Sequence, residues 1–141
     1  MTVTLPENID QRIMKRITIL STIICVLATA CAQRPDDVAF IRDMYDKVLY
    51  EDYAFLEDHC SKNLLAKLSE AYDYDGDGYA VWEFRSGAQD GPGDEHAVIG
   101  IEDQGNGWYG YTAIDMGITF RKRIKISHEG GKIIIDDIAD D

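Results

Sequence analysis

The chain has little of what would assign it to a particular chemistry. It contains three cysteines and three histidines, and their spacing matches neither a metal site nor a nucleophile dyad. It holds no internal repeat and no low-complexity tract. The sequence therefore shows no catalytic constellation above background, and its 141 residues leave room for one domain.

Basic residues are also scarce. The chain has 14 lysines and arginines against 26 aspartates and glutamates, which gives a net charge of −12. A surface of this sign repels phosphate backbones and anionic lipid, so we expect no nucleic-acid partner. It favours solubility and attracts cations.

The one long apolar run, Ile17 to Ala30, is too short to cross a membrane comfortably, which takes about 20 residues. A basic cluster of Arg12, Lys15 and Arg16 precedes it, and small residues end it. This is the order of an export signal, so we expect a signal peptide over residues 1–30. Residues 1–13 are either an extended start of that signal or lie upstream of a true start at Met14.

The end of this leader fits two kinds of processing. Residues 28–30 suit ordinary cleavage, and the same residues followed by Cys31 resemble a lipobox, in which the cysteine is acylated and becomes the new N-terminus. Leu27 stands one place earlier than the usual lipobox leucine. Cysteine number favours lipidation, because Cys25 then leaves with the leader and Cys60 remains as a single thiol. Ordinary cleavage would leave Cys31 and Cys60 as a natural disulfide pair.

Lipidation of Cys31 predicts both the organisation and the location of the chain. Residues 31–37 form a short lipidated tether, and residues 38–141 form one domain. The leader holds two acidic and three basic residues, so 24 acidic and 11 basic residues remain in 31–141. We expect a Gram-negative lipoprotein anchored in the outer membrane of the cell envelope, facing the periplasm or the cell surface.

Helical periodicity fills the first part of this domain. Apolar residues at three- and four-residue spacing from Val38 to Leu49 predict an amphipathic helix. Asp36 and Asp37 suit its first turn, where the unpaired N–H groups and the helix dipole are positive. A second helix is expected over 53–58 and a third after Ser61, which has the chemistry of an N-cap.

Strand patterns follow the helices. The apolar stretch Tyr79–Phe84 predicts a short strand, and Gly- and Asp-rich turns separate four further strands expected at 97–102, 108–115, 118–127 and 132–138. Short links between them predict an antiparallel meander. Helices before strands indicate an α+β fold, with the N-terminal helices packed on one face of a curved antiparallel sheet.

Three aspartates form the sharpest local motif. Asp73, Asp75 and Asp77, followed by Gly78, match the first half of a calcium loop, but Phe84 stands where the loop's final glutamate belongs. The alternatives are a partial calcium site and a solvated acidic turn, and the turn is favoured. No cofactor other than this calcium is expected.

A glycine-rich segment next to Trp82 is the second candidate. Arg85, Gln89 and Asp90 are suited to rim a ligand pocket with this tryptophan, although the segment has no lysine and no phosphate-loop spacing. The alternative is an ordered loop pinned by an Arg85–Asp90 ion pair over a core tryptophan.

The third candidate is a basic stripe in the predicted strand 118–127. The stripe comprises Arg121, Lys122, Arg123 and Lys125, and the acids available to it on neighbouring strands are Glu102, Asp136 and Asp137. Binding of an anion and cross-strand pairing are the alternatives, and pairing is favoured. The histidines, His59, His96 and His128, are expected at the surface or in loops.

Several stretches together point to a family. They are the leader end Ala30-Cys31, Phe40–Tyr50, Cys60–Leu68, Asp75–Trp82, Phe84-Arg85 and Gly87–Asp90. They resemble a family of uncharacterised bacterial lipoproteins of unknown function, over residues 38–138. The resemblance implies the cone fold of the ketosteroid isomerase and SnoaL-like superfamily, also called cystatin-like. It implies no catalytic residues, since an isomerase-type Tyr and Asp set does not map onto this chain.

These observations favour a non-catalytic accessory domain that binds a small molecule or another envelope protein near Trp82, Arg85 and Asp90. The alternatives are a hydrolase or isomerase of the SnoaL-like superfamily and a calcium-stabilised binding module. A deep pocket holding a carboxylate with a raised pKa would favour an enzyme. A filled cone with paired carboxylates would favour the accessory domain.

Overall fold

The computed structural model describes residues 34–87 and 91–141. These described residues belong to one compact unit. Cys31, Gln89 and Asp90 lie outside the described residues, as does the leader. What the sequence predicts for them therefore stays a prediction.

Three helices come first, as predicted: α2 (Pro35–Leu49), α3 (Tyr53–His59) and α4 (Lys62–Glu70). Helix α2 starts inside the predicted tether because a proline suits the first helical turn. The Asp52 side chain caps α3 by accepting from Phe55 N at 3.0 Å. Ser61 Oγ accepts from Leu64 N at 3.3 Å, which confirms Ser61 as the N-cap of α4.

Four strands follow in one sheet: β1 (His96–Gly105), β2 (Trp108–Asp115), β3 (Ile118–Glu129) and β4 (Lys132–Asp140). Their spatial order is β1-β2-β3-β4, and every neighbouring pair is antiparallel. Register shifts in β1 and between Lys125 and Ile126 bend the sheet. The predicted α+β fold with an antiparallel meander is confirmed.

The predicted strand over Tyr79–Phe84 is wrong. Residues Val81–Phe84 form a 3-10 helix, η1, in which Glu83 N donates to Ala80 O at 3.1 Å. A distant contact helps to hold this turn, since Tyr111 Oη donates to Phe84 O at 2.5 Å. A six-residue apolar run has no period that separates strand from helix, so the pattern alone was ambiguous.

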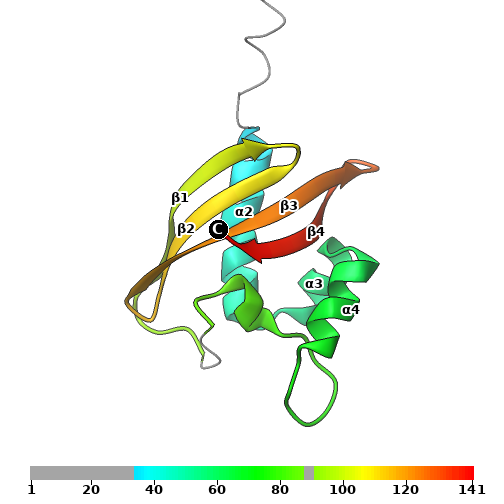
Figure 1. Ribbon diagram of the computed structural model, residues 1–141, viewed down its shortest axis with the longest axis vertical. Helices are drawn as coiled ribbons and strands as arrows, with labels where there is room; N and C mark the ends of the chain where they lie inside the picture. The colour runs from blue at the N-terminus through cyan, green and yellow to red at the C-terminus, as the bar shows by residue number, and fades with distance from the viewer. Residues whose placement is uncertain (1–33, 88–90) are drawn as a thin grey trace, which may run out of the picture. The chain divides into compact units, whose positions relative to one another are not determined.

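The helices cover one face of the sheet (Figure 1). Helix α2 lies against this face, and Tyr45 packs on Tyr111 and Phe120 with ring centroids 6.3 and 6.2 Å apart. Helices α3 and α4 lie beside β4, where Cys60 bridges to Ile135. Alternate residues of β2 point inward to this core, and the residues between them lie on the opposite face of the sheet.

In the part of the chain that the structure describes, no helix is long and apolar enough to cross a membrane.

Candidate functional site

An ion pair lies inside the domain, between the end of η1 and the end of β2. Arg85 Nε and Nη2 donate to Asp115 Oδ2 and Oδ1 at 3.0 and 2.9 Å, and Ser86 Oγ donates to Oδ2 at 3.1 Å. The two side chains of the pair are 2% and 0% exposed. The guanidinium is thus engaged with an internal carboxylate and closed to solvent, which argues against Arg85 as a residue at a pocket rim. The sequence prediction did not consider Asp115 as a partner, and the Arg85–Asp90 pair stays a prediction.

The charge of Arg85 decides the ionisation of Asp115. Burial raises the pKa of Asp115, but the hydrogen bonds from Arg85 and Ser86 and the positive charge of Arg85 lower it to a net value below the ordinary one. Asp115 is therefore a carboxylate at neutral pH. A group in this state is unsuited to act as a general acid.

Side chains fill the space around this pair. Tyr45 Oη donates to Ile114 O at 3.0 Å, and burial raises the pKa of both Tyr45 and Tyr111, so their hydroxyls stay protonated donors. The largest fully buried side chains of the described residues, apart from Arg85, belong to one hydrophobic core cluster: Tyr45, Tyr111, Phe84, Ile41, Met44, Leu49, Leu56, Leu64, Leu68, Ile124 and Ile135. Among the described residues, the space between the helices and the inner face of the sheet is thus packed with core side chains.

Trp82 lies apart from the Arg85 pair, in an aromatic cluster near the surface. Its ring stacks on Tyr72 at 5.9 Å and meets Tyr74 edge-on at 5.8 Å. Gly78 lies beneath this cluster, and a Cβ there would lie 2.5 Å from the Tyr72 ring, so a larger residue would displace that ring. Arg85 N donates to Trp82 O at 3.0 Å, so the two backbones are adjacent, but the Trp82 ring joins this aromatic cluster whereas the Arg85 side chain is buried against Asp115.

The aspartates of the predicted calcium loop do not converge. Asp73, Asp75 and Asp77 are all exposed, and within residues 34–87 and 91–141 no group of three His, Cys, Asp or Glu side chains is arranged to hold a metal ion. Calcium binding stays a prediction. A calcium-dependent rise in melting temperature that disappears in Asp75→Ala/Asp77→Ala would support it.

A hollow of about 280 Å³ opens beside this loop, lined by Tyr53, Glu57, Ser69, Asp77, Gly78 and Tyr79. Two tyrosine rings form walls at 86° to each other, with centroids 5.4 Å apart. Tyr79 Oη donates to Glu57 at 3.3 Å. Two other surface hollows are more open, one beside His96 and Arg42 and one beside the Met116 turn. The first hollow brings Asp77 together with residues that the sequence did not single out.

The sequence also missed a buried carboxylate at the start of α2. Asp37 is 2% exposed and accepts hydrogen bonds from Tyr109 Oη at 2.8 Å and from His128 Nε2 at 2.9 Å. Burial, followed by the hydrogen bond to Asp37 and its charge, raises the pKa of Tyr109 to about 12, so the phenol remains the donor. The only available signal was the place of Asp37 in a helix start. Its partners lie 72 and 91 residues away.

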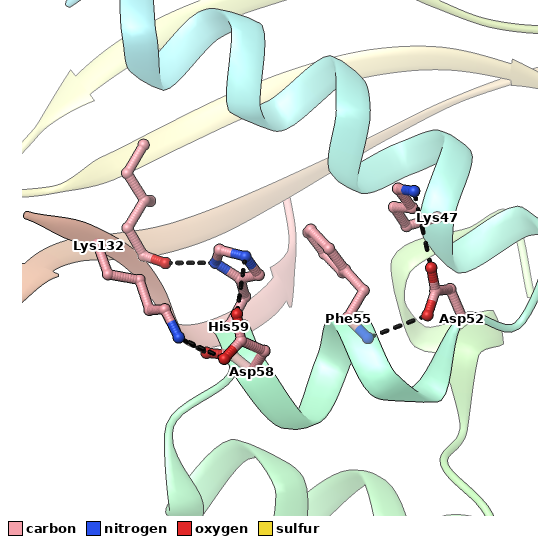
Figure 2. Close-up of polar contacts among 7 residues, drawn as sticks. Lys47, Asp52, Phe55, Asp58, His59 and Lys132 are labelled. Atoms are coloured by element: carbon pink, nitrogen blue, oxygen red, sulfur yellow. Dashed lines mark hydrogen bonds and ion pairs between the residues drawn. The ribbon is translucent and has the colours of Figure 1, made fainter.

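A second histidine joins α3 to the β3–β4 turn (Figure 2). His59 Nδ1 lies 2.9 Å from Ile133 O, and Asp58 pairs with Lys132. The imidazole packs between Phe55 and Phe40 at 4.6 and 5.2 Å. His59 thus ends α3 with its side chain 23% exposed, so it lies at the edge of the core and is held there by aromatic packing.

The basic stripe divides into paired and unpaired residues. Arg121 contacts Glu102 at 2.7 Å and also pairs with Asp141, and Lys122 pairs with Asp140 at 2.5 Å. The prediction of cross-strand pairing is confirmed for Glu102. It is wrong for Asp137, which pairs with Lys67 on α4, and no ion pair of Asp136 is found among the described residues.

The remaining cysteine of the domain is structural. Cys60 is buried, and burial raises its thiol pKa to about 12, so it is not a nucleophile at neutral pH.

No protein-family model, no curated protein and no solved structure matches this sequence. The resemblance to the lipoprotein family and to the SnoaL-like cone therefore stays a prediction.

Proposed function

We propose that this chain is a cell-envelope lipoprotein, anchored through Cys31, whose domain is a non-catalytic accessory module that binds a small molecule or another envelope protein. One observation carries the non-catalytic part of this proposal. The carboxylate at the end of β2, Asp115, is paired with Arg85, has a lowered pKa and is fully buried. An acid–base enzyme of this kind would need an accessible carboxylate with a raised pKa in a pocket.

The partner then binds at the surface rather than inside the cone. The hollow beside Asp77 is the most enclosed of the three described, and its volume of about 280 Å³ suits a small group rather than a large ligand. Its tyrosine walls and its two carboxylates, Glu57 and Asp77, complement a positively charged group. The adjacent rings of Trp82 and Tyr74 extend the same surface.

Anchoring is tested by feeding labelled palmitate to cells that express either the native chain or Cys31→Ser. We expect label on the native chain and none on the variant, because the acyl chain depends on this cysteine. Label on neither, or equal label on both, contradicts the anchored part of the proposal. Cys60→Ser is the matched control and keeps the label.

A second candidate function is hydrolysis or isomerisation, and the Asp37–His128 pair is the observation that favours it. Thermal unfolding of His128→Gln separates the two functions. A structural clamp between α2 and β3 loses stability when it is broken, so we expect a lower melting temperature. A catalytic pair is often held at a cost to stability, so an unchanged or higher melting temperature would favour the enzyme.

A further inference from the structure

A tryptophan and two cations form a patch on the uncovered face of the sheet. Trp108 and Lys125 are partners in the register of β2 and β3, and the Arg123 guanidinium lies over the Trp108 ring, 4.7 Å from its centroid. We call these three residues the Trp108 patch. Tyr109 and Ile124 alternate with them and point to the core.

The cations of the patch form no ion pair with an acid among residues 34–87 and 91–141, although Asp137 stands opposite Lys125 in the register and Asp141 feels the charge of Arg123. Neither Arg123 nor Lys125 forms an ion pair there, and Arg123 Nε is buried without a hydrogen-bond acceptor. Asp141 interacts with the charge of Arg123, but its carboxylate accepts its hydrogen bonds from Arg121 and Gln104. In a chain of net charge −12, two unpaired cations beside a tryptophan are unusual.

The patch lies at the end of the sheet where α2 begins. Tyr109 follows Trp108 in the chain and donates its hydroxyl to Asp37, in the first turn of α2. Figure 1 shows this start of α2 beside the β1–β2 hairpin. The side chains of the patch point away from α2, at the same end of the domain.

The distance from this end to the predicted anchor is short. Three residue steps separate Cys31 from Arg34, which can span at most about 11 Å. We propose that the Trp108 patch rests on the anionic headgroups of the membrane in which Cys31 is anchored. This inference depends on the lipid anchor of the proposed function and adds an orientation and a lipid-binding surface to it.

The chemistry of the patch fits this occupant. Tryptophan has an amphipathic ring that is enriched at membrane–water interfaces, and a stacked guanidinium keeps a planar set of donors that matches phosphate. Acidic groups of the domain are repelled by an anionic surface wherever they come within about one Debye length of it, which is 8–10 Å. Repulsion elsewhere and attraction at the patch favour one orientation.

The sequence contains two tryptophans, so each can be observed alone. The lipidated chain is reconstituted as Trp82→Phe or as Trp108→Phe in vesicles of phosphatidylcholine and phosphatidylglycerol that carry a headgroup nitroxide quencher. We expect Trp108 fluorescence to be quenched at least three-fold more strongly than that of Trp82. Arg123→Gln/Lys125→Gln should remove most of this difference, and Lys62→Gln, an exposed charge on α4, should not.

The outcomes separate the anchor from the patch. Mass spectrometry of the same preparation shows whether Cys31 carries lipid, and its absence overturns both proposals. If lipid is present and the two tryptophans are quenched equally, the patch proposal alone is overturned. The emission of Trp82 in the Arg123→Gln/Lys125→Gln chain reports whether the domain is folded. Lys125→Gln alone is a milder variant, in which we expect the difference in quenching between the two tryptophans to fall by half as much.

Discussion

Replacement of Asp115 by asparagine measures how much the stability of this domain depends on the buried ion pair between Arg85 and Asp115. The substitution keeps the side-chain shape but leaves the Arg85 guanidinium, whose side chain is 2% exposed, without a countercharge. Breaking a buried pair from one side costs about 3–5 kcal/mol. Since the total stability of a domain is about 5–15 kcal/mol, this is a large share of it. At about 4 °C per kcal/mol for a domain of roughly 100 residues, the melting temperature should fall by about 12–20 °C.

Urea unfolding followed by far-ultraviolet circular dichroism is a suitable assay. The double variant Arg85→Met/Asp115→Leu replaces both charges by apolar groups of similar size, and we expect it to recover most of the loss. Lys67→Met is the matched control, because it breaks a pair with Asp137 whose 3.0 Å contact is exposed to solvent. It should cost no more than about 1 kcal/mol.

Two results would refute this reasoning. A loss below about 1 kcal/mol for Asp115→Asn, equal to that of the surface control, would mean that the pair is not desolvated as the structure shows. A double variant as unstable as Asp115→Asn would mean that hydrogen bonding at this site, rather than the unpaired charge, sets the loss.

Three further predictions concern pH, a turn and the thiol. Burial raises the pKa of Asp115, but Arg85 and Ser86 lower it overall. Near the ordinary aspartate pKa of about 3.9 this residue therefore binds more protons in the unfolded chain than in the folded one, and stability should fall as the pH drops below about 4. The dependence of stability on pH should be weaker in Arg85→Met/Asp115→Leu, and an equal dependence would contradict this. Gly107→Ala should lower the free energy of unfolding in urea more than Gly105→Ala does. Both glycines have φ near +80°, but a Cβ at Gly107 would lie 2.6 Å from Ile126 O, whereas one at Gly105 would meet nothing within 4 Å. Equal losses of stability would contradict this. Cys60 in a Cys25→Ser/Cys31→Ser chain should react with a thiol reagent at pH 8 only as fast as the domain opens, since burial raises its pKa to about 12; reaction at the rate of a free thiol would contradict its burial.

Local patterns were sufficient for most of the fold. The three- and four-residue period identified α2, the side-chain chemistry of Ser61 identified the start of α4, and turn residues set the bounds of β2 at Trp108–Asp115 as the structure has them. These features depend on residues close together in the chain, which is why a single sequence reveals them.

The site could not be predicted in the same way, because its partners are distant. Arg85 and Asp115 are 30 residues apart, and Asp37 and His128 are 91 apart. No local pattern distinguishes Asp115 from the many acids of an acidic chain. The fold alone buries this carboxylate, and it also moves Arg85 away from the surface where the sequence placed it.

Dense packing between the helices and the sheet is the claim on which the accessory function depends, and xenon binding tests it most directly. Dry apolar cavities take up xenon, so methyl signals of isotope-labelled isoleucines report on internal space under xenon pressure. The account predicts no saturable shift for the buried Ile41, Ile124 and Ile135, and at most small linear shifts for the exposed Ile99 and Ile118. A saturable shift at Ile124 and Ile135 would reveal a cavity between α2 and the sheet, and it would contradict the claim that core side chains leave no room there for a substrate.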